Sequence, residues 1–429
     1  MASFVISVAA LERNAHILHR TGQQSGAHIL LALKAFATTS AFAYLKPYAA
    51  GCCASGLYEA RLAAEHFGGH VAVYSPAYRE DELRELLSIA HHIDFNSLGQ
   101  WQRYRSTCLA HPRVQSGELQ LGLRVNPCYS TGHTALYDAC APGSRLGIPA
   151  ADLAGADLSG ISGLHFHTLC EQGAQELIDT FRAFENVCAP LLASPAIRYL
   201  NLGGGHWITK PDYDRESLIS LLREIRAKYA VEVYLEPGEA WCIHTGVLRA
   251  QVLDIFESLG YRHAILDVSV SAHMPDVLEM PYRPAVYALK PAPPGPILPT
   301  VYLPEEAYAL AGEARKDVCI CLSGEPPCPP AVCLPGEAYT LAGKAGEAAH
   351  TYRLGAPTCL AGDVLGDYSF PEPLHVGDTL VLDDMTHYTI VKTTHFNGVP
   401  HPDIALLHAD GRQEVVRHFT YADFESRLG

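Results

Sequence analysis

The sequence predicts an α/β protein, in which a (β/α)8 TIM barrel is followed by a mostly antiparallel C-terminal β-domain. Three observations lead to this prediction. Short apolar runs alternate with helical patterns eight times over roughly 210 residues, which is the size of such a barrel. The turn after the first run lacks the glycine-rich fingerprint of a doubly wound sheet. Beyond residue 240 the pattern changes to strands and turns.

Eight runs carry the strand pattern of the barrel. They are residues 28–34, 50–56, 70–75, 92–98, 119–126, 161–167, 198–203 and 231–236. Helical patterns lie between them. In residues 79–90, apolar side chains recur at helical spacing at Leu83, Leu86, Leu87 and Ala90, and residues 215–229 form a second such pattern. We therefore place the barrel at residues 10–240.

The β-domain is expected at residues 1–9 and 241–429. Its strands are predicted at 246–255, 264–270, 377–384 and 388–394. The N-terminal strand, Phe4 to Val8, precedes the barrel without a linker and can join this domain.

Residues 289–349 differ from the rest because they are rich in Pro, Ala and Gly. Residues 303–312 recur in similar form as 334–343, but two copies are too few for a solenoid. We expect an inserted surface excursion with short helices after each Pro, either a harmless loop, which we favour, or one that alters substrate access. The segment holds four cysteines without paired Cys-x-x-Cys spacing, so no metal is assigned and their role stays open: Cys319, Cys321, Cys328 and Cys333.

Composition limits the classes of function. The 429 residues carry a formal net charge of −15, which argues against a nucleic-acid partner. We expect no membrane span, because every run of about 18 apolar residues is broken by a charge. The start lacks a basic n-region, and the 13 cysteines are scattered along the chain. Reduced thiols and a cytoplasmic location are therefore expected.

Chemically useful side chains stand at the carboxyl ends of several predicted strands. Lys34 lies in the apolar run 29–37, at the end of the first strand. His165 and His167 lie at the end of the sixth strand, and Glu236 lies at the end of the eighth. Taken alone, Lys34 is a strand-end lysine that reaches into water, and either histidine is a core residue. Barrel enzymes gather their chemistry at this end of the barrel, so we expect these groups to converge. Desolvation would lower the pKa of Lys34 and free its amine for Schiff-base formation.

Together these groups meet the requirements of pyridoxal 5'-phosphate. Its aldehyde needs a lysine, and its phosphate needs bare backbone N–H groups, which the turn at Gly203, Gly204 and Gly205 can supply. A carboxylate such as Glu236 keeps the ring nitrogen protonated, so that the ring accepts electrons as decarboxylation demands. A cationic partner at that position would suit racemisation better.

Two hypotheses assign the protein to other functional classes. His165 and His167 alternate along one strand face and also suit a metal-dependent barrel hydrolase. That reading needs further His and Asp ligands at other strand ends, where the sequence has Lys, Gly and Glu. A protein that binds pyridoxal phosphate without turnover is the second alternative.

Five motifs resemble one known family. They are Leu31–Phe36 (LALKAF), Phe166–Glu171 (FHTLCE), Asn201–His206 (NLGGGH), Glu236–Ala240 (EPGEA) and Gly355–Tyr368 (GAPTCLAGDVLGDY). The chain resembles the carboxynorspermidine/carboxyspermidine decarboxylases of polyamine biosynthesis. These are relatives of diaminopimelate and ornithine decarboxylases with an alanine-racemase-like barrel. The resemblance covers nearly the whole chain except about 289–349.

The resemblance implies a role for each matching residue. Lys34 would carry the Schiff base, His167 would stack on the ring, and Glu236 would pair with the ring nitrogen. Gly203–Gly205 and Tyr388 would hold the phosphate. Cys359 would protonate the carbon that loses carbon dioxide. Considered without the resemblance, Cys359 could equally be a small, buried apolar residue. Four acidic residues are assigned to the substrate: Glu171, Glu239, Asp267 and Asp363.

The family also implies a homodimer with shared active sites, in which Cys359 reaches the site of the other subunit. Ornithine and diaminopimelate decarboxylases, the alternative assignment, commonly carry Arg where this chain has Glu239. Carboxynorspermidine and carboxyspermidine differ by one methylene, and the sequence does not decide between them.

Overall fold

The computed structural model describes residues 2–132, 134–280, 282–291, 337–344 and 348–429. The chain divides into two compact units. One spans Asn14–Trp241, and the other combines Met1–Arg13 with Cys242–Gly429.

The first unit is a closed parallel barrel, which confirms the predicted fold class. Its strands hydrogen-bond in a ring in which the last strand, β10, pairs with the first, β2, and β5 pairs with β6. The ring is β2 (His28–Ala32), β3 (Gly51–Ala54), β4 (His70–Tyr74), β5 (His92–Phe95), β6 (Gln120–Asn126), β8 (Gly163–His165), β9 (Tyr199–Asn201) and β10 (Glu232–Leu235). The two-residue strand β7 (Ile148–Pro149) pairs with β6 outside the ring.

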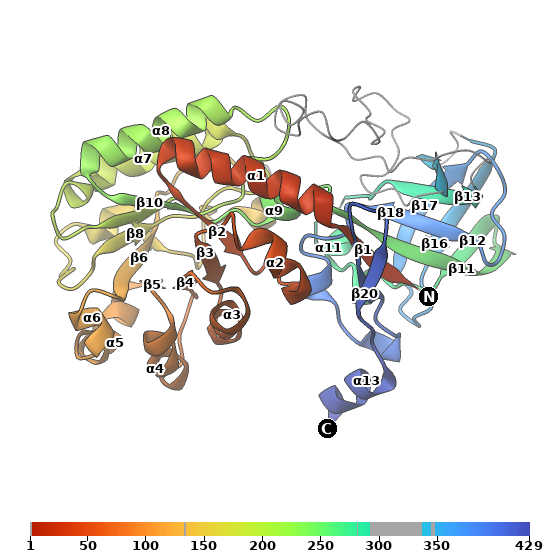
Figure 1. Cartoon of the computed structure of the whole chain (residues 1–429), viewed down its shortest axis with the longest axis horizontal. Helices are drawn as coiled ribbons and strands as arrows, with labels where there is room; N and C mark the ends of the chain where they lie inside the picture. Colours follow the sequence, from red (N-terminus) through yellow and green to blue (C-terminus); the bar gives the residue numbers. More distant parts are fainter. Residues whose placement is uncertain (1, 133, 281, 292–336, 345–347) are drawn as a thin grey trace. The chain divides into compact units, whose positions relative to one another are not determined.

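Helices follow most strands and cover the outside of the barrel, as α7 and α8 do side by side in Figure 1. They are α1 (Val8–Ser25), α2 (Phe42–Leu45), α3 (Leu57–Leu62), α4 (Glu80–Ile89), α5 (Leu98–Leu109), α6 (Pro112–Gln115), α7 (Ala174–Leu192), α8 (Arg215–Tyr229) and α9 (Glu239–Cys242). Short turns of other helix types are η1 (Thr39–Ala41), η2 (Ala63–Phe67), η3 (Ala135–Tyr137) and η4 (Ala150–Leu153).

Local sequence explains where the two predicted helices begin and end. In α4, three acidic residues occupy the first turn, where the helix dipole favours negative charge. Its buried face is Leu83, Leu86 and Leu87. Asp214 caps α8 by accepting a hydrogen bond from the Ser217 N–H at 3.0 Å. The helix ends where Ala230 turns left-handed, with φ of 54°. Both helix predictions are confirmed.

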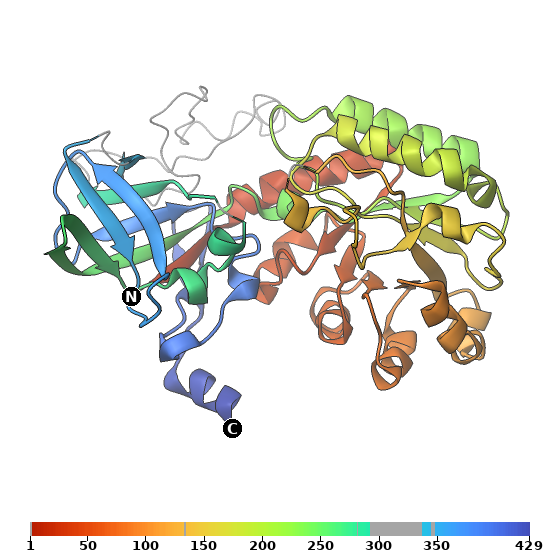
Figure 2. The same ribbon diagram turned by 180° about the vertical axis from the view of Figure 1, so that it is seen from behind.

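The second unit is a curled and mostly antiparallel sheet, seen from behind in Figure 2. Its described strands are β1 (Ser3–Ser7), β11 (Gly246–Ser258), β12 (Tyr261–Leu266), β13 (Val286–Pro291), β14 (Glu337–Leu341), β15 (Gly343–Lys344), β16 (His350–Gly355), β17 (Val364–Phe370), β18 (Thr379–Asp383), β19 (Asp403–Leu407) and β20 (Gln413–Arg417). The N-terminal strand β1 pairs with β11 and β19. The remaining elements are α10 (Val270–His273), α11 (Asp276–Glu279), η5 (Ile390–Lys392), η6 (Phe396–Gly398) and α13 (Tyr421–Leu428).

Two local predictions are wrong. The strand predicted at 388–394 is a turn that contains η5, because Tyr388 adopts a positive φ of 53° that interrupts an extended chain. Lys392 in this turn forms ion pairs with Asp276 and Glu279. The helix predicted after Pro335 is instead the strand β14, because Glu337–Leu341 pairs with β13.

Residues 292–336 lie outside the described ranges, and so do the first copy of the repeat and Cys319, Cys321, Cys328 and Cys333. In the part of the chain that the structure describes, none of the helices has the length and apolar character needed to cross a bilayer.

Candidate active site

Lys34 lies two residues beyond the end of β2. Its side chain is exposed to solvent, but many protein atoms lie near the amine. This environment lowers the pKa of the Lys34 amine, mainly through desolvation, and the positive charge of Arg124 adds to the effect. Cys53 and Glu236 oppose it. The amine is therefore open to a carbonyl reactant and easier to deprotonate than a surface lysine.

Two histidines from the end of β8 face the same carboxylate. His165 is buried, with Nδ1 3.0 Å from Asp94 Oδ2 and Nε2 3.5 Å from Glu236 Oε2. His167 is half-buried, and its Nδ1 lies 3.9 Å from the same Glu236 oxygen. Desolvation and the Lys34 charge lower the pKa of His167 to about 3, so this ring is neutral near pH 7. A neutral, flat ring is suited to packing against another aromatic ring.

Glu236 follows β10 directly and is only 6% exposed. Its Oε1 accepts a 2.7 Å hydrogen bond from Asn201 Nδ2. Burial alone would raise the pKa of Glu236, but the two histidines and the Asn201 donor outweigh it and lower the pKa to about 2. The group is therefore a carboxylate throughout the neutral range.

The glycine turn follows β9 and leaves no room for side chains. Gly203 and Gly205 have φ of 69° and 83°, and a Cβ on Gly204 would stand 2.1 Å from the Glu236 carbonyl oxygen. The Gly203 N–H donates to Asn201 Oδ1 at 2.9 Å, and the Gly204 N–H donates to His167 Nδ1 at 3.4 Å. The Gly205 N–H has no hydrogen-bond partner among the described residues, which leaves a donor available to an anion.

These residues fit pyridoxal phosphate. The turn offers a side-chain-free backbone and an unused N–H. The His167 Nδ1 lies 3.4 Å from the Gly204 nitrogen and 3.9 Å from Glu236 Oε2. The Glu236 carboxylate interacts electrostatically with Lys34. Lys34, His167, Gly203–Gly205 and Glu236 thus gather at the carboxyl ends of the barrel strands, as the sequence predicts for such an enzyme.

The same region also bears on the metal alternative. His165, His167 and Glu236 each offer a ligand atom within 4.8 Å of the others, the one such group of three that the described residues provide. A catalytic zinc site commonly has three protein ligands. However, Glu236 is already hydrogen-bonded to Asn201, and the adjacent Lys34 amine and glycine turn have no role in a metal site.

The structure places four further predicted residues in both units of the chain. Glu171 is exposed in the loop after β8, with φ of 55°, and Glu239 is half-buried at the start of α9. In the second unit, Asp267 Oδ1 accepts from the Gln251 N–H at 2.7 Å. Tyr388 is half-buried in the turn before η5. Their roles toward substrate or phosphate stay predictions.

Cys359 and Asp363 lie in the loop between β16 and β17. Cys359 is exposed, whereas Asp363 is 2% exposed and its carboxylate is hydrogen-bonded to Ser269, Ser271 and Thr358. These hydrogen bonds indicate a structural role for Asp363, which stabilises the loop between β16 and β17. Its contact with substrate stays a prediction.

Sequence reasoning missed several groups that surround the predicted ones. Arg124 on β6 donates to the His167 carbonyl oxygen at 2.7 Å and stacks over the Tyr74 ring, 4.3 Å from its centroid. Asp94 accepts a 2.6 Å hydrogen bond from the Tyr199 hydroxyl inside the barrel. The sequence did contain a signal for these groups: an arginine and an aspartate occupy barrel-strand positions where an apolar residue is expected.

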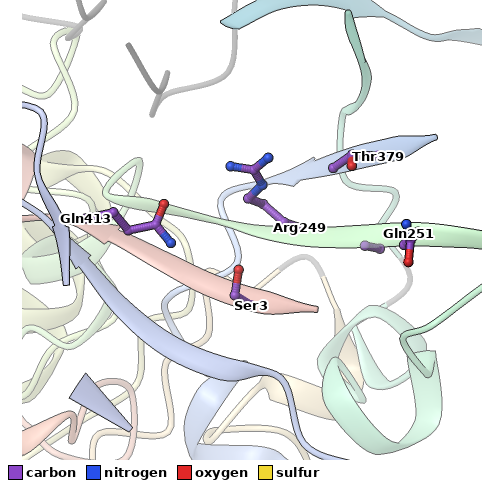
Figure 3. Close-up of a pocket in the computed structure, with 6 residues that line it drawn as sticks. Ser3, Arg249, Gln251, Thr379 and Gln413 are labelled. Carbon is purple, nitrogen blue, oxygen red and sulfur yellow. The ribbon is translucent and has the colours of Figure 1, made fainter. Parts of the chain in front are cut away.

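Outside this region, a shallow pocket of the second unit is lined by polar side chains (Figure 3). Ser3 from β1, Arg249 and Gln251 from β11, Thr379 from β18 and Gln413 from β20 form it. It contains none of the predicted site residues, and we assign it no chemistry.

The chain has relatives among known decarboxylases over nearly its whole length. No family model matches it. It is 40% identical to carboxyaminopropylagmatine decarboxylase of Synechocystis over 99% of this chain and 95% of the relative. It is 38% identical to carboxynorspermidine/carboxyspermidine decarboxylase of Campylobacter jejuni, over 99% of this chain and 97% of the relative. The enzyme of that name from Herminiimonas arsenicoxydans is 33% identical over 99% and 98% of the two chains.

Solved structures agree with these relatives. The carboxynorspermidine decarboxylase of Campylobacter jejuni, crystallised with norspermidine, matches with a TM-score of 0.78 and 37% identity over 100% of this chain and 99% of that one. Diaminopimelate decarboxylase of Helicobacter pylori shares the fold, with a TM-score of 0.74 and 14% identity over 100% and 98%. The resemblance drawn from the five motifs is thereby confirmed, and the chain belongs to the carboxynorspermidine/carboxyspermidine decarboxylase family.

Proposed function

We propose that this protein is a pyridoxal-phosphate-dependent carboxy-lyase that converts carboxynorspermidine, carboxyspermidine or both to norspermidine and spermidine. The observation that carries the proposal is the gathering of Lys34, neutral His167, Glu236 and the glycine turn at one end of the barrel. The family relatives and the norspermidine complex of the Campylobacter enzyme support the substrate class.

Each residue has a distinct task in this proposal. When bound, pyridoxal phosphate would accept the electron pair that carbon dioxide leaves behind. Lys34 would hold the cofactor through its amine and give way to the substrate amine. Glu236, a carboxylate with a pKa of about 2, would keep a proton on the ring nitrogen. His167 would pack on the ring, and Gly205 would donate its N–H to the phosphate with support from Tyr388.

Cys359 would deliver the proton that replaces carbon dioxide. We propose that it does so in a homodimer, where Cys359 of one copy completes the site of the other. Glu171, Glu239, Asp267 and Asp363 would attract the cationic amines of the substrate. We place the enzyme in the cytoplasm, which the nine free cysteines among the described residues support. Cell fractionation would test the location.

A second substrate has a specific observation in its favour. The Synechocystis relative, 40% identical, is named for carboxyaminopropylagmatine, which ends in a guanidinium group rather than an amine. Diaminopimelate and ornithine remain less favoured, because structures of that type share only the fold at 14–16% identity.

The first experiment is the visible spectrum of the purified protein before and after borohydride reduction, followed by peptide mapping and metal analysis. We expect an absorption band of bound pyridoxal phosphate and reductive labelling of Lys34. A stoichiometric metal without such a band would favour the hydrolase alternative. Decarboxylation of the five candidate substrates, measured as carbon dioxide release, would then rank them.

Subunit complementation tests the shared site. Lys34→Ala and Cys359→Ala proteins should each be impaired, and an equal mixture should recover about a quarter of wild-type activity. Random exchange of subunits makes half of the dimers heterodimers, and each heterodimer has one intact site out of two. No recovery in a mixture shown to exchange subunits would place Lys34 and Cys359 of one site on the same copy.

A further inference from the structure

Cys359 is held by a residue that none of the motifs points to, Asn397 in η6. The Cys359 backbone N–H donates to Asn397 Oδ1 at 3.0 Å, and Cys359 Sγ lies 3.2 Å from the same oxygen. Because a backbone N–H can only donate, the side-chain atom that faces it must be the carbonyl oxygen of the amide. The thiol therefore donates to this oxygen as well, and one acceptor fixes both the backbone and the sulfur.

The backbone of Asn397 explains why an asparagine stands there. Its φ of 54° and ψ of 13° are left-handed, and Gly398 follows with φ of 66°. Apart from glycine, asparagine is among the few residues that adopt this conformation at low cost. Glycine would fit the turn equally well but would offer no oxygen to Cys359. The position thus combines a conformational and a hydrogen-bonding requirement.

Aromatic rings hold the turn that carries Asn397. His395 stacks on His401 with ring centroids 3.9 Å apart, and Phe424 of α13 meets His395 edge-on at 5.9 Å. His401 Nε2 lies 2.8 Å from the Thr394 carbonyl oxygen. The Thr394 N–H in turn donates to Ala272 of α10 at 2.7 Å. The turn is therefore fixed to the C-terminal helix on one side and to α10 on the other.

The residue before Cys359 is tied to the same helix. Thr358 Oγ1 donates to the Asp363 carboxylate, which also accepts from Ser269 Oγ at 2.7 Å and from the Ser271 N–H at 3.0 Å. Ser269 is the N-cap of α10. The two flanks of Cys359 thus converge on one four-residue helix. Among the described residues, the hydrogen bond of the sulfur itself is to the Asn397 amide.

We propose that Asn397 is a positioning residue that holds the Cys359 thiol in the orientation from which it donates its proton. This inference rests on the proposed function. In the step that it serves, the S–H bond breaks and a C–H bond forms at the carbon that has lost carbon dioxide. The thiolate then regains a proton from solvent before the next turnover.

The test uses three holoenzyme variants. Asn397→Gly keeps the left-handed turn and removes only the amide, Asn397→Asp keeps an oxygen acceptor at the same place, and Cys359→Ala removes the thiol. We expect Asn397→Gly to lower kcat about tenfold with KM and bound cofactor unchanged, because proton delivery depends on placement. Asn397→Asp should remain within about threefold of wild type.

A second readout does not depend on activity. Iodoacetamide labelling of Cys359, followed by peptide mapping, should be several-fold faster in Asn397→Gly. Without the Asn397 amide, the Cys359 side chain can adopt more rotamers. Cys128 is an internal control, since it is also exposed and its backbone N–H donates to a different asparagine, Asn126. Its labelling rate should not change.

Each outcome decides a separate point. Unchanged kcat and unchanged Cys359 labelling in Asn397→Gly would overturn the proposal. So would a further loss when Asn397→Gly is added to Cys359→Ala, because Asn397 would then act without the thiol. If no candidate substrate is decarboxylated, the proposed function fails, while faster Cys359 labelling would still support the tether.

Discussion

The two ends of the barrel use the same side chain, histidine, in opposite ways. At the carboxyl ends of the strands, His165 and His167 face the Glu236 carboxylate within 3.9 Å. At the opposite end, four histidines stand at or next to the starts of strands and face aromatic rings. His28, His70 and His92 pack with Tyr199 or Tyr234. His91 stacks on His70.

Ring stacking at the start of the strands is close. His92 lies parallel to Tyr199 with centroids 3.8 Å apart, and His70 meets His92 edge-on at 4.3 Å. Desolvation lowers the pKa of His70 to about 3 and that of His92 well below its usual value. Both rings are therefore neutral at pH 7 and serve as core residues. The contrast teaches that a buried neighbouring carboxylate, rather than histidine itself, distinguishes chemistry from packing. His28 also faces a carboxylate, Glu232 at 2.9 Å, but both of these side chains are exposed.

The largest effect is expected at the chemical end. Lys34→Ala should lower turnover by at least about a thousandfold, because the lysine both holds the cofactor and exchanges with the substrate amine. Since the side chain is exposed, the melting temperature of the cofactor-free protein should stay nearly unchanged. Decarboxylation assays and thermal unfolding of the apo form would check both. Normal turnover in this variant would refute the role of Lys34.

Glu236→Gln should lower kcat by about a hundredfold, because a neutral amide cannot keep the ring nitrogen protonated. The variant keeps the side-chain shape and an oxygen that can accept from Asn201. Bound cofactor, measured by its absorbance, should remain. A wild-type kcat would show that the charge of Glu236 is dispensable.

At the packing end the expected effect is on stability. His92→Ala removes a buried ring stacked on Tyr199 and should lower the free energy of unfolding by about 3 kcal/mol. The kcat of the folded fraction should stay within about twofold of wild type, because the ring is remote from the reacting groups at the other strand ends. Urea denaturation and activity of the same sample would check this. A loss of kcat with unchanged stability would reverse the comparison.

Acid should also act at the packing end. Below about pH 6.5, unfolded chains bind protons that neutral His70 does not bind until about pH 3. Stability therefore falls as the pH decreases through this window, by about 1 kcal/mol per such histidine between pH 7.5 and 5.5.

His70→Phe tests this dependence. His91 and His28 oppose protonation of His70, and Glu236 weakly favours it. Phe keeps a ring against His92 and Tyr234 but cannot titrate, so its urea midpoint should drop less on acidification than that of wild type. An equal drop in both proteins would assign acid sensitivity to other groups.

The smallest effect is expected at the edge of the site. Glu239→Gln should raise KM for a polyamine substrate about threefold and leave kcat unchanged, because one partly exposed charge contributes little. The difference should shrink at high salt. Initial rates at two ionic strengths would measure it, and a salt-independent change in KM would show that Glu239 does not act through charge.

Strand and helix positions of the barrel could be predicted because the pattern is local. Leu83, Leu86 and Leu87 repeat at helical spacing and form the buried face of α4. Residues 388–394 were mistaken for a strand for the same reason. Their β-branched composition suits a strand, but the positive φ of Tyr388 and the ion pairs of Lys392 with α11 decide the conformation.

The barrel, its glycine turn and the residues at its strand ends follow from local patterns in the sequence, because parallel strands bring all their carboxyl ends to one side. The groups that surround these residues follow from contacts between distant parts of the chain. Arg124 beside His167, Asn201 on Glu236 and Asn397 on Cys359 join residues 35 to 43 positions apart in the chain. No periodicity links such positions. Hydrogen bonds between them form only when folding brings the loops together, and those contacts set the charge of Glu236 and the placement of the thiol.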